Sequence, residues 1–470
     1  MSQAKKIIKN FTWLTIAELA TKGISFFTNA YLARVILAEG YGKINFAIAT
    51  VTYFITFVTL GLNVIGAREV ARNPERKSFY VETILSIRVL VCLLSFAIYF
   101  SFIFINNFSP SQTQILIIAS IYILSATFLI DWYYQGLEKM EILAVRQFLI
   151  ASLNLIGIML FVRSSQDSTI AIIIMASSTL INTLFLLVPY LKETKRLKFN
   201  FNLNILKSFI KEAIPISLTQ VFLVFLSSSS IILIGLVIPS PDTKLGIYTA
   251  ANKLMVLLFL PITVIQIVFY PYFSKSDRID DRQKAYRKYI TFNIIIGVFL
   301  STFFFLHADI AINIVYGSNY TSSILLFKIM MAIVLMSYIS QTAIHPLIAW
   351  KKEKKVFKII FISSIFNVIL NILLISQYEL LGAIVANILT ELFLMAFFIR
   401  LIRSIVKKYP FDIIIKIILV GFVASFVSYF ILKYTNYLIL SIIASIITYF
   451  FIILALKIIT IDEIKGYLKK

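Results

Sequence analysis

The chain is dominated by uninterrupted apolar runs of about 20 residues or more, which recur at intervals of about 30 residues from one end to the other. An α-helix needs about 20 apolar residues to cross a bilayer, because only a segment that bonds its own backbone is tolerated in hydrocarbon. The runs cover residues 11–36, 44–66, 80–105, 114–136, 143–162, 169–190, 212–238, 246–273, 289–307, 322–349, 356–376, 381–402, 412–432 and 437–459. The sequence therefore predicts an all-α polytopic membrane protein with about 14 transmembrane helices.

Composition agrees with this class and excludes others. Of the 470 residues 60% are apolar and only 14% are charged, whereas a soluble domain has roughly a quarter charged residues. The net charge of +22 would suit nucleic acid, but the basic residues occur in short clusters between apolar runs, so we expect no nucleic-acid partner. A single cysteine, Cys92, excludes a disulfide framework and a thiolate metal site. Because nucleotide-binding and metalloprotease motifs are missing, we expect neither an enzyme nor a bound cofactor or metal.

Lysine and arginine are concentrated in alternate connections between the runs. These basic connections lie at residues 68–77, 139–146, 192–198, 275–288, 351–355 and 403–408. The positive-inside rule places them, and both termini, in the cytoplasm. The longest, residues 191–211, follows the sixth run and predicts an N-terminal lobe at 1–190, a C-terminal lobe at 212–402 and two further helices with a tail at 403–470. Residues 42–47 and 246–251 begin similarly, as expected of two parallel repeats.

Polar side chains at helical spacing occur within three of the runs. They are Glu18, Lys22, Ser25 and Asn29 in the first, Asn45, Thr52 and Thr56 in the second, and Thr249, Asn252, Thr263 and Gln266 in the eighth, with Lys253 at the edge of that stripe. Residues three and four apart lie on one face of a helix, so each set forms a polar stripe. The stripes predict a shared hydrated cavity, although hydroxyl and amide groups also join packed membrane helices.

Charged groups inside the runs allow a structural and a functional interpretation. Glu18 can neutralise Lys22 one turn away, or both can bind substrate or an ion. Arg34 lies near the outer interface, where it can extend to water or contact substrate. Asp131 precedes Trp132 and is either an interfacial anchor or an ion site.

A further carboxylate lies in the middle of the twelfth run. Glu391 follows Asn387 by one turn, and both are expected to face Asn367 and Asn371 of the eleventh run. An ionisable group at this depth is a candidate proton or Na⁺ site.

Several segments resemble the Wzx-type polysaccharide flippases of the multidrug, oligosaccharidyl-lipid and polysaccharide exporter superfamily. In chain order they are residues 31–47 (YLARVILAEGYGKINFA), 131–136 (DWYYQG), 246–253 (GIYTAANK), 316–320 (YGSNY) and 367–391, which contains Gly382-Ala383. Together they extend over essentially the whole chain.

This resemblance implies two six-helix lobes around a cavity that opens alternately to each side of the bacterial cytoplasmic (inner) membrane. The implied cargo is an undecaprenyl-diphosphate-linked oligosaccharide, the precursor of O-antigen in lipopolysaccharide or of another surface polymer. Lys22 and Lys253 match the cavity cations of relatives by helix and depth. The resemblance also implies H⁺ or Na⁺ antiport, with Glu18, Glu391 and Asp131 as candidate sites, and as partners membrane lipids, a polysaccharide polymerase and a chain-length regulator.

Three other functions are weaker alternatives. A cation-driven drug exporter of the same fold should carry carboxylates rather than lysines in its interior. A lipid II flippase is disfavoured because the second stripe has no basic residue. A membrane-embedded glycosyltransferase or polymerase should carry a large outer loop, whereas the outer connections here do not exceed about 15 residues.

Overall fold

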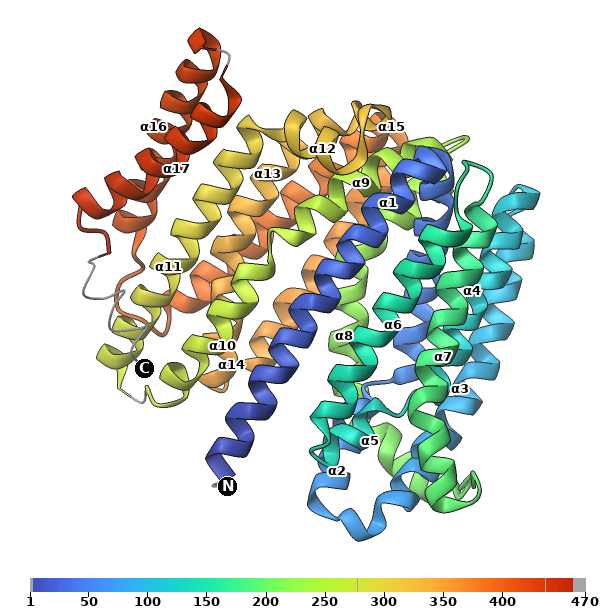
Figure 1. Cartoon of the computed structure of the whole chain (residues 1–470). Coiled ribbons are helices and arrows are strands. Elements are labelled where there is room, and N and C mark those ends of the chain that lie inside the picture. Colours follow the sequence, from blue (N-terminus) through green and yellow to red (C-terminus); the bar gives the residue numbers. More distant parts are fainter. Residues whose placement is uncertain (1–2, 277, 436, 460–470) are drawn as a thin grey trace. The chain divides into compact units, whose positions relative to one another are not determined.

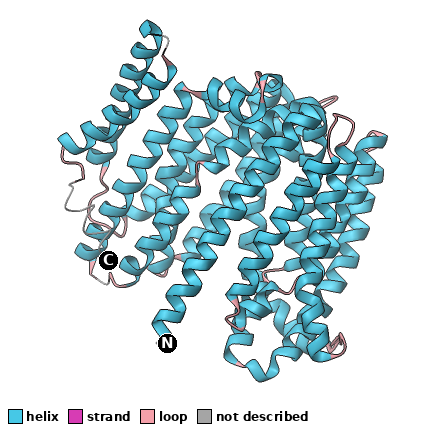
Figure 2. Ribbon diagram, in the orientation of Figure 1, coloured by secondary structure: helices cyan, strands magenta, loops and turns pink. Residues whose placement is uncertain are grey.

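The computed structural model describes residues 3–276, 278–435 and 437–459, with side chains from Ala20 onward. Within these ranges the chain forms helices joined by short connections, and no strand occurs (Figure 2). Twelve helices in the same ranges are long and apolar enough to cross a membrane. The predicted all-α, polytopic membrane fold is confirmed.

The chain consists of two compact units, residues 1–249 and 250–470. The first contains α1 (Gln3–Thr59), α2 (Leu62–Arg72), α3 (Lys77–Ile105), α4 (Pro110–Phe128), α5 (Asp131–Gly136), α6 (Met140–Phe161), α7 (Ser168–Thr194), α8 (Leu203–Val237) and the start of α9 (Asp242–Leu257) (Figure 1). The second continues with α10 (Leu260–Ser274), α11 (Ile279–Leu306), α12 (Ala308–Tyr316), α13 (Ser323–Ser340), α14 (Ile344–Ala349), α15 (Glu353–Arg403), α16 (Phe411–Thr435) and α17 (Leu438–Ala455). Because α8 packs against α1 in the first unit, the predicted lobe boundary at 191–211 stays a prediction.

Two helices are too long to be single membrane spans. Helix α1 has 57 residues, which at 1.5 Å each would extend about 85 Å, against a hydrocarbon core of about 30 Å. It changes direction at Leu37, where φ is 58° and ψ is −179°, and α15 does so at Glu379, where φ is 50°. Each kink falls in a predicted break, at 36–44 and 376–381. The count of fourteen separate spans remains a prediction.

The kink in α1 packs directly against the start of α9. A Cβ atom at Gly42 would overlap the carbonyl oxygen of Asp242, and one at Gly246 would overlap that of Ala38. Only glycine lets two backbones approach this closely. The glycines that begin the two similar segments, Gly42 and Gly246, therefore lie at one close contact of the first unit, which explains why each segment begins with glycine.

Two predicted spans, 44–66 and 114–136, are broken near one end rather than continuous. Helix α1 ends at Thr59 and α2 begins after Leu60 and Gly61, which both have positive φ, while α4 ends at Phe128 and α5 begins at Asp131. The short helices α2 and α5 pack together, and Gly66 leaves room for the buried ring of Trp132. Hydropathy could not predict these breaks, because the apolar runs continue across them to Gly66 and Gly136.

In the first unit, connections poor in lysine and arginine lie at one end, and basic connections lie at the other. At one end the Gln112 amide donates to the carbonyl of Lys43 (3.3 Å), and the Tyr31 hydroxyl donates to that of Val162 (3.0 Å). At the other end, ion pairs join Lys77 to Glu193 and Arg68 to Glu212. The basic connections thus lie together at the end opposite the loops poor in lysine and arginine, as the alternation predicts.

The second unit also gathers its basic connections at one end. Lys407 pairs with Asp280 (2.8 Å), and the Arg282 guanidinium lies 5.5 Å from the centre of the Trp350 ring. The segments at 275–288, 350–355 and 403–412 therefore form one basic face of this unit.

Candidate functional site

The first candidate face lies on α1, before the kink. The side chain of Ser25 is exposed, and those of Lys22 and Asn29 are partly buried. The Asn29 amide donates to the backbone carbonyl of Ser25 (2.7 Å), which aligns the two residues on one face. Arg34 is exposed farther along the helix. The side chain of Glu18 lies outside the described residues, so its predicted pairing with Lys22 stays a prediction.

The stripe on the second half of α1 is bonded within its own helix. Asn45, Thr52 and Thr56 each donate to the carbonyl four residues earlier, at 2.7, 2.7 and 2.8 Å. Asn45 and Thr56 are also buried, at 4% and 9% exposure. A threonine hydroxyl that already donates to the backbone can offer a sugar only its acceptor oxygen, and Asn45 keeps one free amide N–H but is almost fully buried. The packing interpretation therefore suits Asn45 and Thr56 better than substrate binding, whereas Thr52 is partly accessible.

An arginine that the sequence analysis missed occupies the centre of a buried polar cluster in the first unit. Arg88 of α3 is fully buried, and its guanidinium donates to the carbonyls of Leu129 (2.8 Å) and Ala126 (3.4 Å) and to Oδ1 of Asn63. Those carbonyls stand at the end of α4, where they have no partner within the helix. A positive charge there also complements the helix dipole. Arg88 thus supplies hydrogen-bond donors to the backbone carbonyls at the break between α4 and α5.

Asp131, at the start of α5, belongs to the same cluster. Its carboxylate interacts electrostatically with Arg88 and with Arg146 of α6, and Oδ1 accepts the backbone N–H of Trp132 (2.9 Å). Arg146 is only 5% exposed, and within the described residues its Nε and Nη1 have no hydrogen-bond partner. Asp131 therefore interacts favourably with the charges of two buried arginines, a role that neither sequence interpretation foresaw.

The motif at residues 131–136 also anchors the surrounding helices. The Tyr134 hydroxyl donates to the carbonyl of Leu186 on α7 (2.8 Å), and a Cβ at Gly136 would meet Val70 of α2. These residues belong to an apolar core that also includes Trp132 and Tyr190. The motif joins α2, α5 and α7 at the basic end of the unit.

In the second unit, Asn252 and Lys253 lie on α9 with partly buried side chains. On α15, the predicted contact between Asn387 and Asn367 is confirmed, because the Asn367 amide donates to Oδ1 of Asn387 (3.0 Å). Glu391 was also predicted to face Asn367 and Asn371. Its carboxylate instead accepts a hydrogen bond from the Ser340 hydroxyl of α13.

Comparisons with known proteins agree with this architecture. The profile of the polysaccharide biosynthesis protein family matches residues 7–277. The chain is 22% identical over 405 residues to the "Putative O-antigen transporter" of Escherichia coli K12, covering 84% of this chain and 96% of that one. A Shigella dysenteriae protein of the same name is 23% identical over 404 residues, covering 84% of this chain and all of the relative.

Among solved structures, the fold is similar to the inward closed conformation of lipid II flippase MurJ. The TM-score is 0.75 at 16% identity, covering 93% of this chain and 97% of that one. An inward-facing multidrug resistance MATE family transporter matches with a TM-score of 0.62 at 13% identity, covering 82% and 95%. Fold and relatives together define the class: a multi-pass membrane protein with the fold of these two transporters. Within that class, the chain belongs to the polysaccharide biosynthesis protein family.

Proposed function

We propose that the protein carries an undecaprenyl-diphosphate-linked oligosaccharide from the cytoplasmic to the outer leaflet of the bacterial inner membrane by alternating access. One observation carries the proposal: Lys22 stands on a membrane helix of a polysaccharide biosynthesis protein, on the same face as the exposed Ser25. A lysine at mid-membrane costs several kcal/mol unless it faces water, a partner or a substrate. An anionic lipid head is the substrate that such a group would favour.

The chemistry of this cargo matches the residues available. The hydrocarbon core repels the charged, hydrated head, while the polyprenyl tail is stable in lipid, so a carrier must shelter only the head. Lys22 and Lys253 would each offer a charge-assisted hydrogen bond to diphosphate oxygens. Ser25, Asn29, Thr52 and Asn252 would replace water around the sugar hydroxyls, and Arg34 would meet the head near the outer end.

Glu391 is the coupling site that we favour. Its carboxylate is held by a neutral hydroxyl, that of Ser340, and can exchange a proton or accept Na⁺. Asp131 already interacts electrostatically with Arg88 and Arg146 and is less suited to this exchange. We further propose that the basic connections of both units and both termini face the cytoplasm.

Transport by reconstituted protein tests the substrate. In proteoliposomes, a fluorescent undecaprenyl-diphosphate oligosaccharide should become accessible to an external membrane-impermeant quencher faster than in protein-free vesicles. Fluorescent lipid II and the organic cation ethidium serve as competing cargoes. Faster movement of lipid II would identify a peptidoglycan-precursor flippase, and ethidium movement alone would identify a drug exporter. Either outcome would overturn the proposal.

A further inference from the structure

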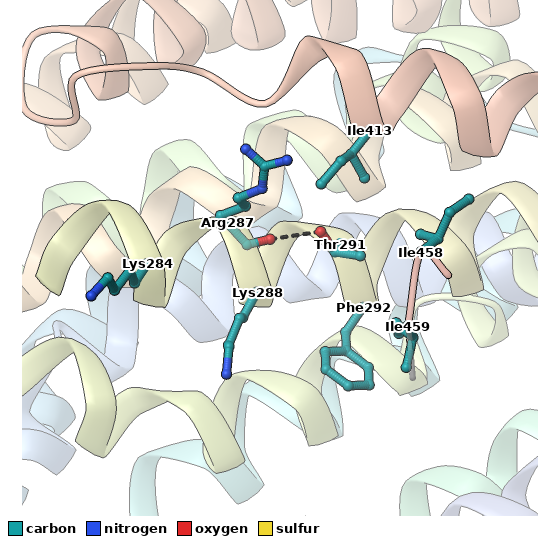
Figure 3. Close-up of a pocket in the computed structure, with 8 residues that line it drawn as sticks. All are labelled: Lys284, Arg287, Lys288, Thr291, Phe292, Ile413, Ile458 and Ile459. Atoms are coloured by element: carbon teal, nitrogen blue, oxygen red, sulfur yellow. Dashed lines mark hydrogen bonds between the residues drawn. The ribbon is translucent and has the colours of Figure 1, made fainter. Parts of the chain in front are cut away.

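A hollow at the basic end of the second unit combines cations with an apolar wall. Its volume is about 240 Å³, and it is lined by Lys284, Arg287, Lys288, Thr291 and Phe292 of α11, by Ile413 of α16, and by Ile458 and Ile459 after α17. Figure 3 shows the lysines at one end and Ile458 at the other. From Lys284 to Phe292 the lining changes from charged to apolar over about 12 Å along the helix.

A second hollow lies beside the first and shares two of its residues. This hollow, of about 370 Å³, is lined by Phe269, Tyr272, Lys275, Ser276, Asp281, Ala285 and the same Lys284 and Lys288. The two lysines are one turn apart, so they lie on one face of α11. Both are exposed, and both belong to the last basic turns before the apolar run that begins at Tyr289. That position is characteristic of a membrane interface.

The nearby acidic groups do not neutralise this pair. Arg287 is bonded to Asp412 (3.1 Å), and Asp280 is bonded to Lys407, although Lys284 also contributes to its electrostatics. Asp281 lines the second hollow. Within the described residues neither Lys284 nor Lys288 has a carboxylate within 4.0 Å. Positive charge therefore exceeds negative charge where the two hollows meet.

We propose that these hollows bind an anionic phospholipid of the surrounding bilayer. The phosphate lies between Lys284 and Lys288, and an acyl chain follows Phe292, Ile413 and Ile458. Charge complementarity and the change from basic to apolar lining fit a lipid that stands upright at an interface. A free phosphate would use the lysines but not the apolar wall. The site is independent of the transported cargo.

Native mass spectrometry of the full chain in detergent tests this assignment. We expect retention of dioleoyl phosphatidylglycerol over dioleoyl phosphatidylcholine, and an affinity about 10-fold lower when Lys284→Gln and Lys288→Gln are combined. The paired change Lys284→Arg with Lys288→Arg should restore binding. The matched control combines Lys354→Gln with Lys355→Gln, which removes two exposed cations from another basic connection.

Each outcome supports or overturns the lipid site. Unchanged unfolding midpoints in lipid-free detergent would show that the glutamine variant is folded, so that lost binding reflects the site. Equal retention of both lipids, equal loss in the control, or undiminished binding by the glutamine variant would overturn it. Displacement of the lipid by inorganic phosphate at constant ionic strength would instead assign the lysines to a free anion.

Discussion

Replacement of Arg88 by methionine should destabilise the first unit severely. Methionine preserves most of the apolar length of the side chain but removes the guanidinium. Three acceptors, Asn63 Oδ1 and the carbonyls of Leu129 and Ala126, then lose the donor that the fully buried Arg88 supplies. Asp131 also loses its favourable electrostatic interaction with Arg88.

The expected loss follows from two of these contacts. The bond to Ala126 is long, at 3.4 Å, and carries little weight. Hydrogen bonds to charged groups contribute about 1.5–3 kcal/mol each, whereas measured bonds between membrane helices average about 0.6 kcal/mol. At the lower figure for bonds to charged groups, about 1.5 kcal/mol each, the two remaining bonds give about 3 kcal/mol. For a unit of 249 residues this corresponds to an unfolding midpoint lowered by about 6 °C.

Thermal unfolding of purified protein in detergent checks this estimate. The matched control is Arg163→Met, because Arg163 is an exposed arginine that also donates to a backbone carbonyl, that of Leu160. The control should stay within about 0.5 kcal/mol of the wild type. Combining Arg88→Met with Asp131→Asn should cost less than the sum of the single changes, because the stranded carboxylate is removed too. Equal midpoints for Arg88→Met and Arg163→Met would refute the role of Arg88.

Three further predictions concern other parts of the chain. Gly246→Ala should reduce the amount of folded protein in the membrane, because the added Cβ would overlap the Ala38 carbonyl oxygen. The control Gly23→Ala should be neutral in the same expression assay, because the added Cβ has no neighbour within 4 Å. Backbone N–H groups of Arg163 (2.9 Å) and Ser164 (2.8 Å) bond to Asp167 and lower the pKa of its carboxyl, so both bonds persist above that pKa and are lost as the pH falls through it. Hydrogen exchange should therefore show that the amides of Arg163 and Ser164 lose protection only in strong acid. Loss of their protection already near pH 5 would contradict this. Cysteines substituted for Lys354 and Lys433 should react with impermeant reagents from opposite faces of the membrane. Labelling of both cysteines from the same face would disprove the predicted orientation.

The fold was largely predictable because hydrocarbon imposes strong rules on sequence. Runs long enough to span and alternate basic connections predicted helices and the gathering of basic residues at one end of each unit. The breaks before α2 and α5 were not predictable, because hydropathy reports apolar length and not whether the backbone is continuous. They depend on local contacts such as the ring of Trp132 on Gly66.

The candidate site was predicted less completely. Helical spacing correctly placed Asn45, Thr52 and Thr56 on one helix, but it cannot distinguish a donor that faces water from one bonded to its own backbone. Arg88 was missed because it lies in an apolar run whose other charge, Glu82, is near the start, and because it belongs to no stripe. An isolated arginine at that depth is itself a signal of a buried partner.

The most direct test of the account is the rate at which lysine variants move the lipid-linked oligosaccharide in proteoliposomes. Lys22→Gln and Lys253→Gln should each slow the movement by about 10-fold, because each removes a charge-assisted bond to the diphosphate, while Lys22→Arg should retain most of the rate. The control Lys433→Gln, which changes an exposed lysine in the last turn of α16, should match the wild type. Wild-type rates for both interior glutamine variants, at equal amounts of reconstituted protein, would contradict the central claim that interior lysines bind an anionic head group.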